Sequence, residues 1–268
     1  MRIAQISDTH MTASAPGPGG YDSGAALQAV LERLDRLRPD VILLTGDLAA
    51  DGLPEEYGRL CEIIGGFGVP IAAIPGNHDR RAAFVNALAP SEIAIGEGPC
   101  LWVAVEDGPV RLLGLDTIGA NDSPDGLIGD AQLAWVADRL AGKDRRPVLV
   151  FMHHPPFRLG LPMDPSRCHD GDDLARVLTG HRRVLGATCG HVHRTARIGW
   201  AGTIGSVCPS VAWEIPLDLA PDGEILLVRQ SPAFQLHIFD PELGLVTHTE
   251  YVMLPEATNR ATGSPATG

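Results

Sequence analysis

The sequence predicts an α/β protein, a four-layer αββα sandwich in which two mixed β-sheets pack between outer helices. Five short apolar runs alternate with amphipathic segments, a rhythm typical of parallel strands joined by crossover helices. Further strand-like segments, mostly in the second half, have the spacing of hairpins and favour a second sheet. With 268 residues, 44% of them hydrophobic, the chain is long enough to bury such a core.

The five apolar runs are expected to form one largely parallel sheet. They are RIAQIS (2–7), VILLTG (41–46), VPIAAIPG (69–76), RPVLVFM (146–152) and RVLGATCG (183–190). The first helix is expected over 24–38, because its leucines recur with helical period, Ser23 can act as N-cap and Pro39 ends the pattern. Other helices are expected over 54–65, 130–140 and 172–178.

The remaining strand-like segments are assigned to the second sheet. They are CLWVAV (100–105), VRLLGLDT (110–117), GTIGSVCPSV (202–211), AFQLHIF (233–239) and GLVTHTEYV (244–252). We expect residues 1–256 to form a single domain. Residues 257–268 are small, polar and unpatterned, so a flexible C-terminal tail is expected there.

Composition restricts the classes of partner. The formal net charge is −12 and the arginines are dispersed, which argues against a nucleic acid polymer, because such a partner usually requires a basic groove. No apolar run is long enough to cross a bilayer, and the N-terminus lacks a leader pattern, so a cytoplasmic protein without a membrane partner is expected. Five scattered cysteines without a CxxC motif favour reduced thiols, although a single disulfide remains open.

Polar residues gather where each of the five apolar runs ends. The clusters are DTH (Asp8, His10), GD (Asp47), GNHD (Asn77, His78, Asp79), HH (His153, His154) and GHVH (His191, His193). Ligands collect beyond the carboxyl ends of parallel strands, so these clusters point to one crevice. A mixed carboxylate, imidazole and amide set suits iron, manganese, zinc or cobalt. So many candidate ligands exceed one tetrahedral ion and fit two ions that share a carboxylate.

These blocks, in this order and spacing, resemble the calcineurin-like metallophosphoesterases. FMHHPP and MDPSRCHDG additionally resemble the bacterial class III cyclic-nucleotide phosphodiesterases and glycerophosphodiesterases. The resemblance implies the metallophosphoesterase fold and two divalent ions. The implied ligands are Asp8, His10, Asp47 and His193 for the first ion, and Asp47, Asn77, His153 and His191 for the second.

The resemblance also implies an activity. Small phosphodiesters, 3′,5′-cyclic nucleotides or glycerophosphodiesters, would be hydrolysed by in-line attack of a hydroxide that bridges the two ions. Asp47 and His78 are the implied catalytic residues, and Asn77, His78 and His193 the implied substrate contacts. Residues around 200–225 are expected to serve as a cap or dimerisation segment, which predicts a homodimer or a higher homo-oligomer.

Several readings stay open at this point. A phosphomonoesterase could use the same metal pair, and a non-catalytic scaffold of the same fold is disfavoured because every ligand position is filled. His154 should point to the opposite face from His153 and make a structural hydrogen bond near Pro155 and Pro156. His169, together with Cys168, could line the substrate pocket or lie in a polar surface loop. Arg81 could approach a phosphate, but a solvated position at a helix start is favoured.

Overall fold

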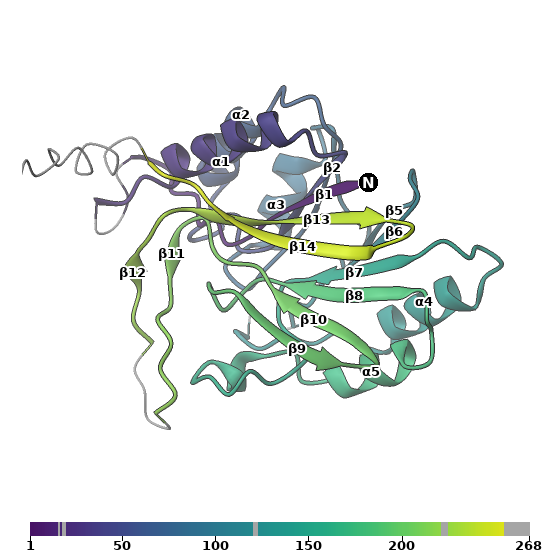
Figure 1. Cartoon of the computed structure of the whole chain (residues 1–268). Helices are drawn as coiled ribbons and strands as arrows, with labels where there is room; N and C mark the ends of the chain where they lie inside the picture. Colours follow the sequence, from purple (N-terminus) through teal and green to yellow (C-terminus); the bar gives the residue numbers. More distant parts are fainter. Residues whose placement is uncertain (16, 18–19, 120–122, 221–224, 255–268) are drawn as a thin grey trace, which may run out of the picture.

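The computed structural model describes residues 1–15, 17, 20–119, 123–220 and 225–254. The tail expected at 257–268 lies outside the described residues. Two six-stranded sheets pack face to face, and helices cover their outer faces (Figure 1). The predicted four-layer αββα architecture of two mixed sheets is therefore confirmed.

The first sheet combines the N-terminal strands with the C-terminal hairpin. Its order is β14 (Gly244–Tyr251), β13 (Ala233–Asp240), β1 (Arg2–Ile6), β2 (Val41–Thr45), β3 (Ile71–Ile74) and β4 (Ile93–Ala94). Strands β1 to β4 run parallel, whereas β13 is antiparallel to both β1 and β14. The outer face packs against α1 (Ser23–Leu37), α2 (Pro54–Ile64) and α3 (Arg81–Leu88).

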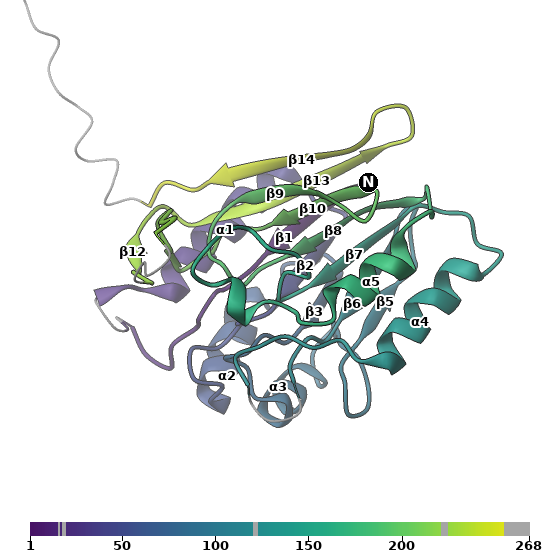
Figure 2. The same cartoon turned by 90° about the horizontal axis from the view of Figure 1, so that it is seen from below.

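The second sheet is built from the central part of the chain. Its order is β5 (Val103–Val105), β6 (Arg111–Leu115), β7 (Val148–Met152), β8 (Val184–Cys189), β10 (Thr203–Val207) and β9 (Ala196–Trp200). Strands β6, β7, β8 and β10 are parallel, and β5 and β9 are antiparallel edges. Helices α4 (Asp130–Ala141) and α5 (Gly171–Leu178) lie over this sheet in the view from below (Figure 2). A 3₁₀ turn, η2 (Asp164–Ser166), precedes α5.

The expectation that all five apolar runs share one sheet is wrong. The first three form β1, β2 and β3 in one sheet, and the last two form β7 and β8 in the other. The physical reason is that a strand buried on both faces reads as a continuous apolar run in either sheet. The N-cap of α1 also differs from the prediction, because the carboxylate of Asp22 accepts from the Ala25 N–H and Ser23 begins the helix.

Side chains of β1 and β2 alternate between two hydrophobic layers. Ile3 and Leu43 belong to the layer between the sheets, whereas Ile6 and Leu44 pack toward α1 and α2. This alternation follows from the two-residue period of a strand. Toward the carboxyl ends of the strands, the layer between the sheets becomes polar, with Gln5 and Thr45 fully buried.

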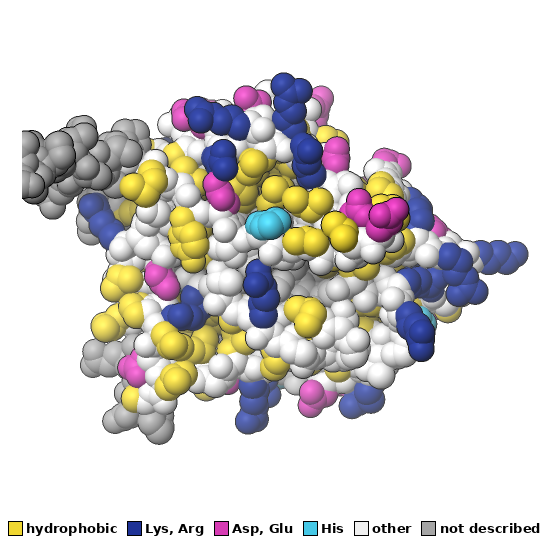
Figure 3. All heavy atoms as spheres, viewed as in Figure 1, with side chains coloured by type: hydrophobic (Ala, Val, Ile, Leu, Met, Phe, Trp, Pro, Cys, Tyr) yellow, Lys and Arg dark blue, Asp and Glu magenta, His cyan; other side chains and the backbone are white. Residues whose placement is uncertain are grey.

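A short hairpin stands away from the two sheets (Figure 1). It is formed by β11 (Trp213–Glu214) and β12 (Val228–Arg229), which pair antiparallel. Its described residues include five apolar side chains that are more than half exposed: Leu217, Leu219, Ile225, Leu226 and Leu227. Hydrophobic side chains gather over this hairpin at the lower left of the face in Figure 3. No helix in the described part of the chain combines the length and apolar character needed to cross a bilayer.

Candidate metal centre

The predicted ligands lie in the loops that directly follow strands of both sheets. Asp8, Asp47 and Asn77 follow β1, β2 and β3 of the first sheet, and His153 and His191 follow β7 and β8 of the second. Because the two sheets pack face to face, these loops meet at one end of the seam between them. The predicted ligands therefore come together from the strand ends of two sheets rather than of one.

The backbone at these loops is unusual. Seven non-glycine residues in the described chain have positive φ, and five of them are predicted ligands: Asp8 (54°), His10 (39°), Asp47 (50°), His191 (74°) and His193 (51°). A non-glycine residue in this region costs on the order of 1–3 kcal/mol and is typically found at functional sites. The left-handed turns aim successive polar side chains back into the seam, which regular strand geometry would not do.

Four predicted ligands form one compact group. Asp8, His10, Asp47 and His193 offer ligand atoms that all lie within 4.8 Å of one another, and all four residues are buried. The Nε2 atoms of His10 and His193 are 3.0 Å apart. Asp47 Oδ2 lies 3.7 Å from His10 Nε2, and Asp8 Oδ1 lies 3.4 Å from His193 Nε2. These four residues are the set that the sequence assigned to the first ion.

A second group adjoins the first through Asp47. The Nε2 atom of His153 lies 3.3 Å from Asp47 Oδ2 and 3.2 Å from Asn77 Oδ1. The His191 ring is 5.2 Å from the His153 ring between centroids, and its buried Nε2 has no hydrogen-bond partner. The structure thus brings Asp47, Asn77, His153 and His191 together, as the sequence predicted for the second set.

The expected orientation of His154 needs correction. Its ring lies beside that of His191, 4.6 Å between centroids, rather than on the opposite face. Both ring nitrogens nevertheless have partners, Thr117 Oγ1 at 2.8 Å and the Pro124 carbonyl at 3.1 Å. The two ring nitrogens therefore bond to Thr117 and Pro124 rather than near Pro155. Both nitrogens are thus already used in hydrogen bonds.

Backbone carbonyls fix the imidazole orientations. His153 Nδ1 donates to the Thr45 carbonyl at 2.8 Å, and His193 Nδ1 donates to the Trp213 carbonyl at 2.9 Å. A carbonyl only accepts, so each bond places the proton on Nδ1 and leaves Nε2 free to bind a metal. The Trp213 indole also stacks on His10, with centroids 4.9 Å apart. The sequence gives no sign of the carbonyl contact, because a backbone carbonyl is common to every residue type.

Asp79 holds the loops after β2 and β3 together through hydrogen bonds. Its fully buried carboxylate accepts hydrogen bonds from four donors, the N–H groups of Leu48, Ala49 and Gly76 and the Tyr57 hydroxyl. These bonds tie the loop after β2 to the loop after β3. Burial and the nearby Asp47 carboxylate raise the pKa of Asp79 to about 6.

Close packing of charges shifts the pKa values of the ligands in opposite directions. Burial lowers the pKa of His10 and of His191 to about 3, so both rings are neutral. Burial would also lower the pKa of His153, but the Asp47 carboxylate raises it to about 9. Burial alone would raise the pKa of Asp47, yet the imidazole of His153 holds it well below its usual range. In the metal-free state, these two groups form a charged pair.

The donor set fits a pair of divalent ions. His10 and His193 direct Nε2 atoms at each other, and His191 Nε2 is a buried polar atom without a partner. The first two nitrogens can share a hydrogen bond, but a buried His191 Nε2 without a partner is costly, and a bound ion would satisfy it. Two neutral imidazoles and a carboxylate at the border of both groups match metals that accept mixed nitrogen and oxygen ligands.

His78 lies at the solvent side of the group. Its ring stands edge-on to His10, with centroids 4.6 Å apart, and Nδ1 donates to the Ala50 carbonyl at 2.7 Å. Nε2 is therefore the nitrogen available to a substrate. The backbone N–H of His78 donates to Asp47 Oδ1 at 2.8 Å, which fixes the loop against the carboxylate.

Residues whose roles stayed open have other partners. His169 Nε2 lies 3.1 Å from Asp125 Oδ2, with both side chains largely exposed. Cys168 is buried beside Asp170. Arg81 is not simply solvated, because its guanidinium forms a two-point ion pair with the buried Asp116 carboxylate.

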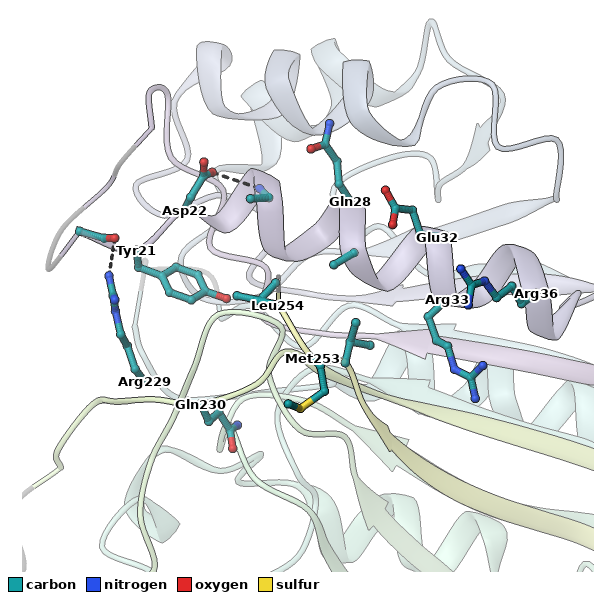
Figure 4. Close-up of a pocket in the computed structure, with 14 residues that line it drawn as sticks. Tyr21, Asp22, Gln28, Glu32, Arg33, Arg36, Arg229, Gln230, Met253 and Leu254 are labelled. Carbon is teal, nitrogen blue, oxygen red and sulfur yellow. Dashed lines mark hydrogen bonds between the residues drawn. The ribbon is translucent and has the colours of Figure 1, made fainter. Parts of the chain in front are cut away.

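The cavity of about 960 Å³ beside α1 contains none of the predicted ligands. Tyr21 and Arg229 lie at one end, and Arg33 and Arg36 lie at the other (Figure 4). The cavity is linked to the candidate centre through Tyr21, whose ring stands edge-on to Trp213, and Trp213 in turn stacks on His10. The candidate site is therefore identified by its cluster of possible metal ligands and not by the size of a cavity.

Comparisons with known proteins agree on one family. The model of the calcineurin-like phosphoesterases matches residues 1–195. The chain is 33% identical to the probable glycerophosphodiester phosphodiesterase of Arcobacter nitrofigilis, over 94% of this chain and 93% of that protein. It is 32% identical to the 3′,5′-cyclic adenosine monophosphate phosphodiesterase of Escherichia coli K12, over 75% and 73%. A dimetal phosphatase from Danio rerio shares the fold, with a TM-score of 0.67, 16% identity and coverage of 94% and 99%.

Proposed function

The chain belongs to the calcineurin-like phosphoesterase family and is therefore a hydrolase of phosphate esters; on that premise, we propose that it is a dinuclear-metal phosphodiesterase acting on small diesters. One observation carries the proposal: Asp47 lies at the border of two groups of ligand atoms, 3.7 Å from His10 Nε2 and 3.3 Å from His153 Nε2. A carboxylate between two imidazole groups is suited to bridging two ions.

The proposed ligands divide as the sequence predicted. Asp8, His10, Asp47 and His193 would hold one ion, and Asp47, Asn77, His153 and His191 the other. His154 is left out of both sets because its two nitrogens already have partners. The metals are manganese, iron, zinc or cobalt, because all four accept this mixed donor set.

When bound, the two ions supply the hydroxide for in-line attack at phosphorus and neutralise the phosphoryl oxygens. The residues of the chain do the rest. Asp47 would set the spacing of the two ions, and Asn77 and His193 would contact the phosphoryl group of the substrate. Because Nδ1 of His78 donates to the Ala50 carbonyl, the solvent-side Nε2 would donate only when the ring carries a second proton; this imidazolium would give a hydrogen bond to the phosphoryl oxygens or a proton to the leaving alkoxide.

Small diesters are the favoured substrates. One relative, matched over 94% of this chain, is named for a glycerophosphodiester, and another, matched over 75%, is named for a cyclic nucleotide. A formal net charge of −12 argues against a long polyanion, whereas a small diester needs only a local positive centre. A phosphomonoesterase remains the alternative, because the same ligand set would serve a monoester. A non-catalytic scaffold is disfavoured by the complete set of ligands.

We also propose that residues 1–256 form one domain and that two copies associate through the hairpin of β11 and β12. The exposed leucines of the hairpin, such as Leu217 at 60% and Leu219 at 67%, support an apolar contact between copies. Light scattering on the purified protein should give at least a dimer, and replacing both leucines with serine should give a monomer. The cytoplasmic location expected from the sequence remains a prediction.

The function is tested by comparing three substrates on one manganese-loaded preparation with a chelator-treated control. We expect kcat/KM for 3′,5′-cyclic AMP or for a glycerophosphodiester to exceed that for p-nitrophenyl phosphate, and activity to vanish in the control. Preference for the cyclic nucleotide would indicate turnover of a nucleotide messenger. Preference for the glycerol diester would indicate breakdown of lipid-derived diesters. Preference for the monoester would refute the phosphodiesterase assignment.

A further inference from the structure

One fully buried amide connects the two sheets directly beneath the candidate metal centre. Gln5, on β1, faces the layer between the sheets and is 0% exposed. Its Nε2 donates to Thr45 Oγ1 on β2 and to the Cys189 carbonyl on β8, each at 3.0 Å. Its Oε1 accepts from Thr188 Oγ1 at 2.5 Å and from His237 Nε2 at 3.1 Å. All hydrogen-bonding positions of this amide are therefore used.

The direction of these bonds is determined. The Cys189 carbonyl can only accept, so the amide nitrogen must face it and Oε1 must face Thr188 and His237. His237 must then donate from Nε2, which leaves its Nδ1 to accept from Thr247 Oγ1 at 2.8 Å. Thr188 in turn accepts from Ser206 Oγ at 3.1 Å. A fully satisfied buried network of this kind allows one arrangement of its members.

The bonded groups lie two or three residues before metal ligands. Gln5 precedes Asp8 by three residues, Thr45 precedes Asp47 by two, and Cys189 precedes His191 by two. Much of the remaining contact between the sheets is made by apolar side chains such as Ile3 and Leu43, and hydrophobic contact is non-directional. Hydrogen bonds depend on distance and angle, so the Gln5 amide restricts sliding of one sheet over the other.

We propose that Gln5 is a positioning residue, whose amide sets the offset between the two sheets and thereby the spacing of the two groups of metal ligands. The inference rests on the proposed dinuclear function, because only a centre assembled from both sheets is sensitive to that offset. Asp8 and Asp47 come from one sheet, and His153 and His191 come from the other. Ions in two-metal sites lie about 3.5–4 Å apart, so small offsets matter.

Gln235 provides a matched control. It is the register partner of Gln5 on β13 and is also 0% exposed between the sheets. Its Nε2 donates to the Val207 carbonyl at 2.9 Å, and its Oε1 has no partner. Neither β13 nor β10 carries a predicted ligand. Replacing Gln235 therefore disturbs the same layer without disturbing the strands beneath the ligands.

The test titrates Mn²⁺ into metal-depleted protein and follows binding by calorimetry and by electron paramagnetic resonance, which reports exchange coupling between paired ions. Gln5→Leu should weaken binding of Mn²⁺ by about 10–100-fold, as loss of outer-shell support typically does, and should change the coupling. Gln235→Leu should lower the melting temperature but leave both readouts unchanged. Thr188→Val, which removes one of the two donors to Oε1, provides a milder change that is expected to shift affinity and coupling in the same direction, should Gln5→Leu not fold.

The possible outcomes separate the two proposals. Failure of the unaltered protein to bind two Mn²⁺ ions would refute the dinuclear function itself. Two coupled ions in the unaltered protein, with equal affinity and unchanged coupling in the folded Gln5→Leu or Thr188→Val variant, would refute the positioning role alone. Equal losses of affinity in the Gln5→Leu and Gln235→Leu variants would also refute it, because general loosening of the layer would then explain the effect.

Discussion

Gly46, between β2 and the proposed bridging ligand Asp47, allows a test of how closely the site is packed. Its φ is +88°, and an added Cβ would lie 2.7 Å from Cγ of the His153 ring. Gly66 has a similar φ of +82° with nothing within 4 Å of the added atom. The two Gly→Ala changes therefore share backbone strain but differ in steric pressure on a proposed ligand.

The expected losses of stability follow from backbone strain and from steric overlap with the His153 ring. Left-handed backbone at a residue with a Cβ costs about 1–2 kcal/mol, which is the loss of stability expected for Gly66→Ala. Overpacking adds about 1–3 kcal/mol for Gly46→Ala. Displacement of the His153 ring should also weaken Mn²⁺ binding by about 10–100-fold, whereas Gly66→Ala should bind Mn²⁺ normally.

Urea unfolding of the metal-free variants measures the stability difference, and calorimetric titration measures Mn²⁺ affinity. Equal destabilisation by the two changes, with unaltered Mn²⁺ binding in both, would show that the loop after β2 adjusts freely. The reasoning that glycine is required there for close approach to His153 would then be wrong.

Three further outcomes are expected. Asp47→Ala should abolish hydrolysis and tight binding of at least one ion, and full activity with two bound ions would contradict a bridging role. His78→Ala should keep both ions, measured by metal analysis, but slow turnover by about 100-fold or more; loss of metal would instead make His78 a ligand. Burial and the nearby Arg197 lower the pKa of His237 to about 4, so its contribution to stability is complete above pH 6.5 and is lost as the pH falls toward 4. Urea unfolding of metal-free protein should therefore show about 3 kcal/mol more acid destabilisation than the His237→Asn variant, and parallel pH profiles would refute the assignment.

More of the candidate site than of the sheet arrangement could be predicted from the sequence. Asp8, Asp47 and His153 follow apolar runs that end in short polar clusters, and such positions converge wherever parallel strands end. The same apolar runs do not reveal which sheet each strand joins, because burial on both faces removes the alternation that would distinguish them. The sequence therefore predicted that these side chains lie together, as the structure has them, but assigned their strands to a single sheet.

Two kinds of structural feature had no sequence signal. The carbonyl of Trp213 orients His193, and any residue type offers the same carbonyl. Positive φ at His191 and His193 gives these side chains directions that the two-residue period of a strand does not describe. Strand geometry does not apply to these two residues, because β8 ends at Cys189.

A centre at the seam of two sheets makes metal binding part of the stability of the fold. Asp8 and Asp47 on one side and His153 and His191 on the other would be held together by the same ions, so separating the sheets would break ligand bonds in both sets. Ions that bind only the native state would stabilise it by about 2.7 kcal/mol for one site at a metal concentration one hundred times its Kd. The Gln5 amide opposes the same separation with hydrogen bonds. Metal removal should therefore magnify the destabilisation caused by Gln5→Leu, because two restraints that act across one seam are not independent.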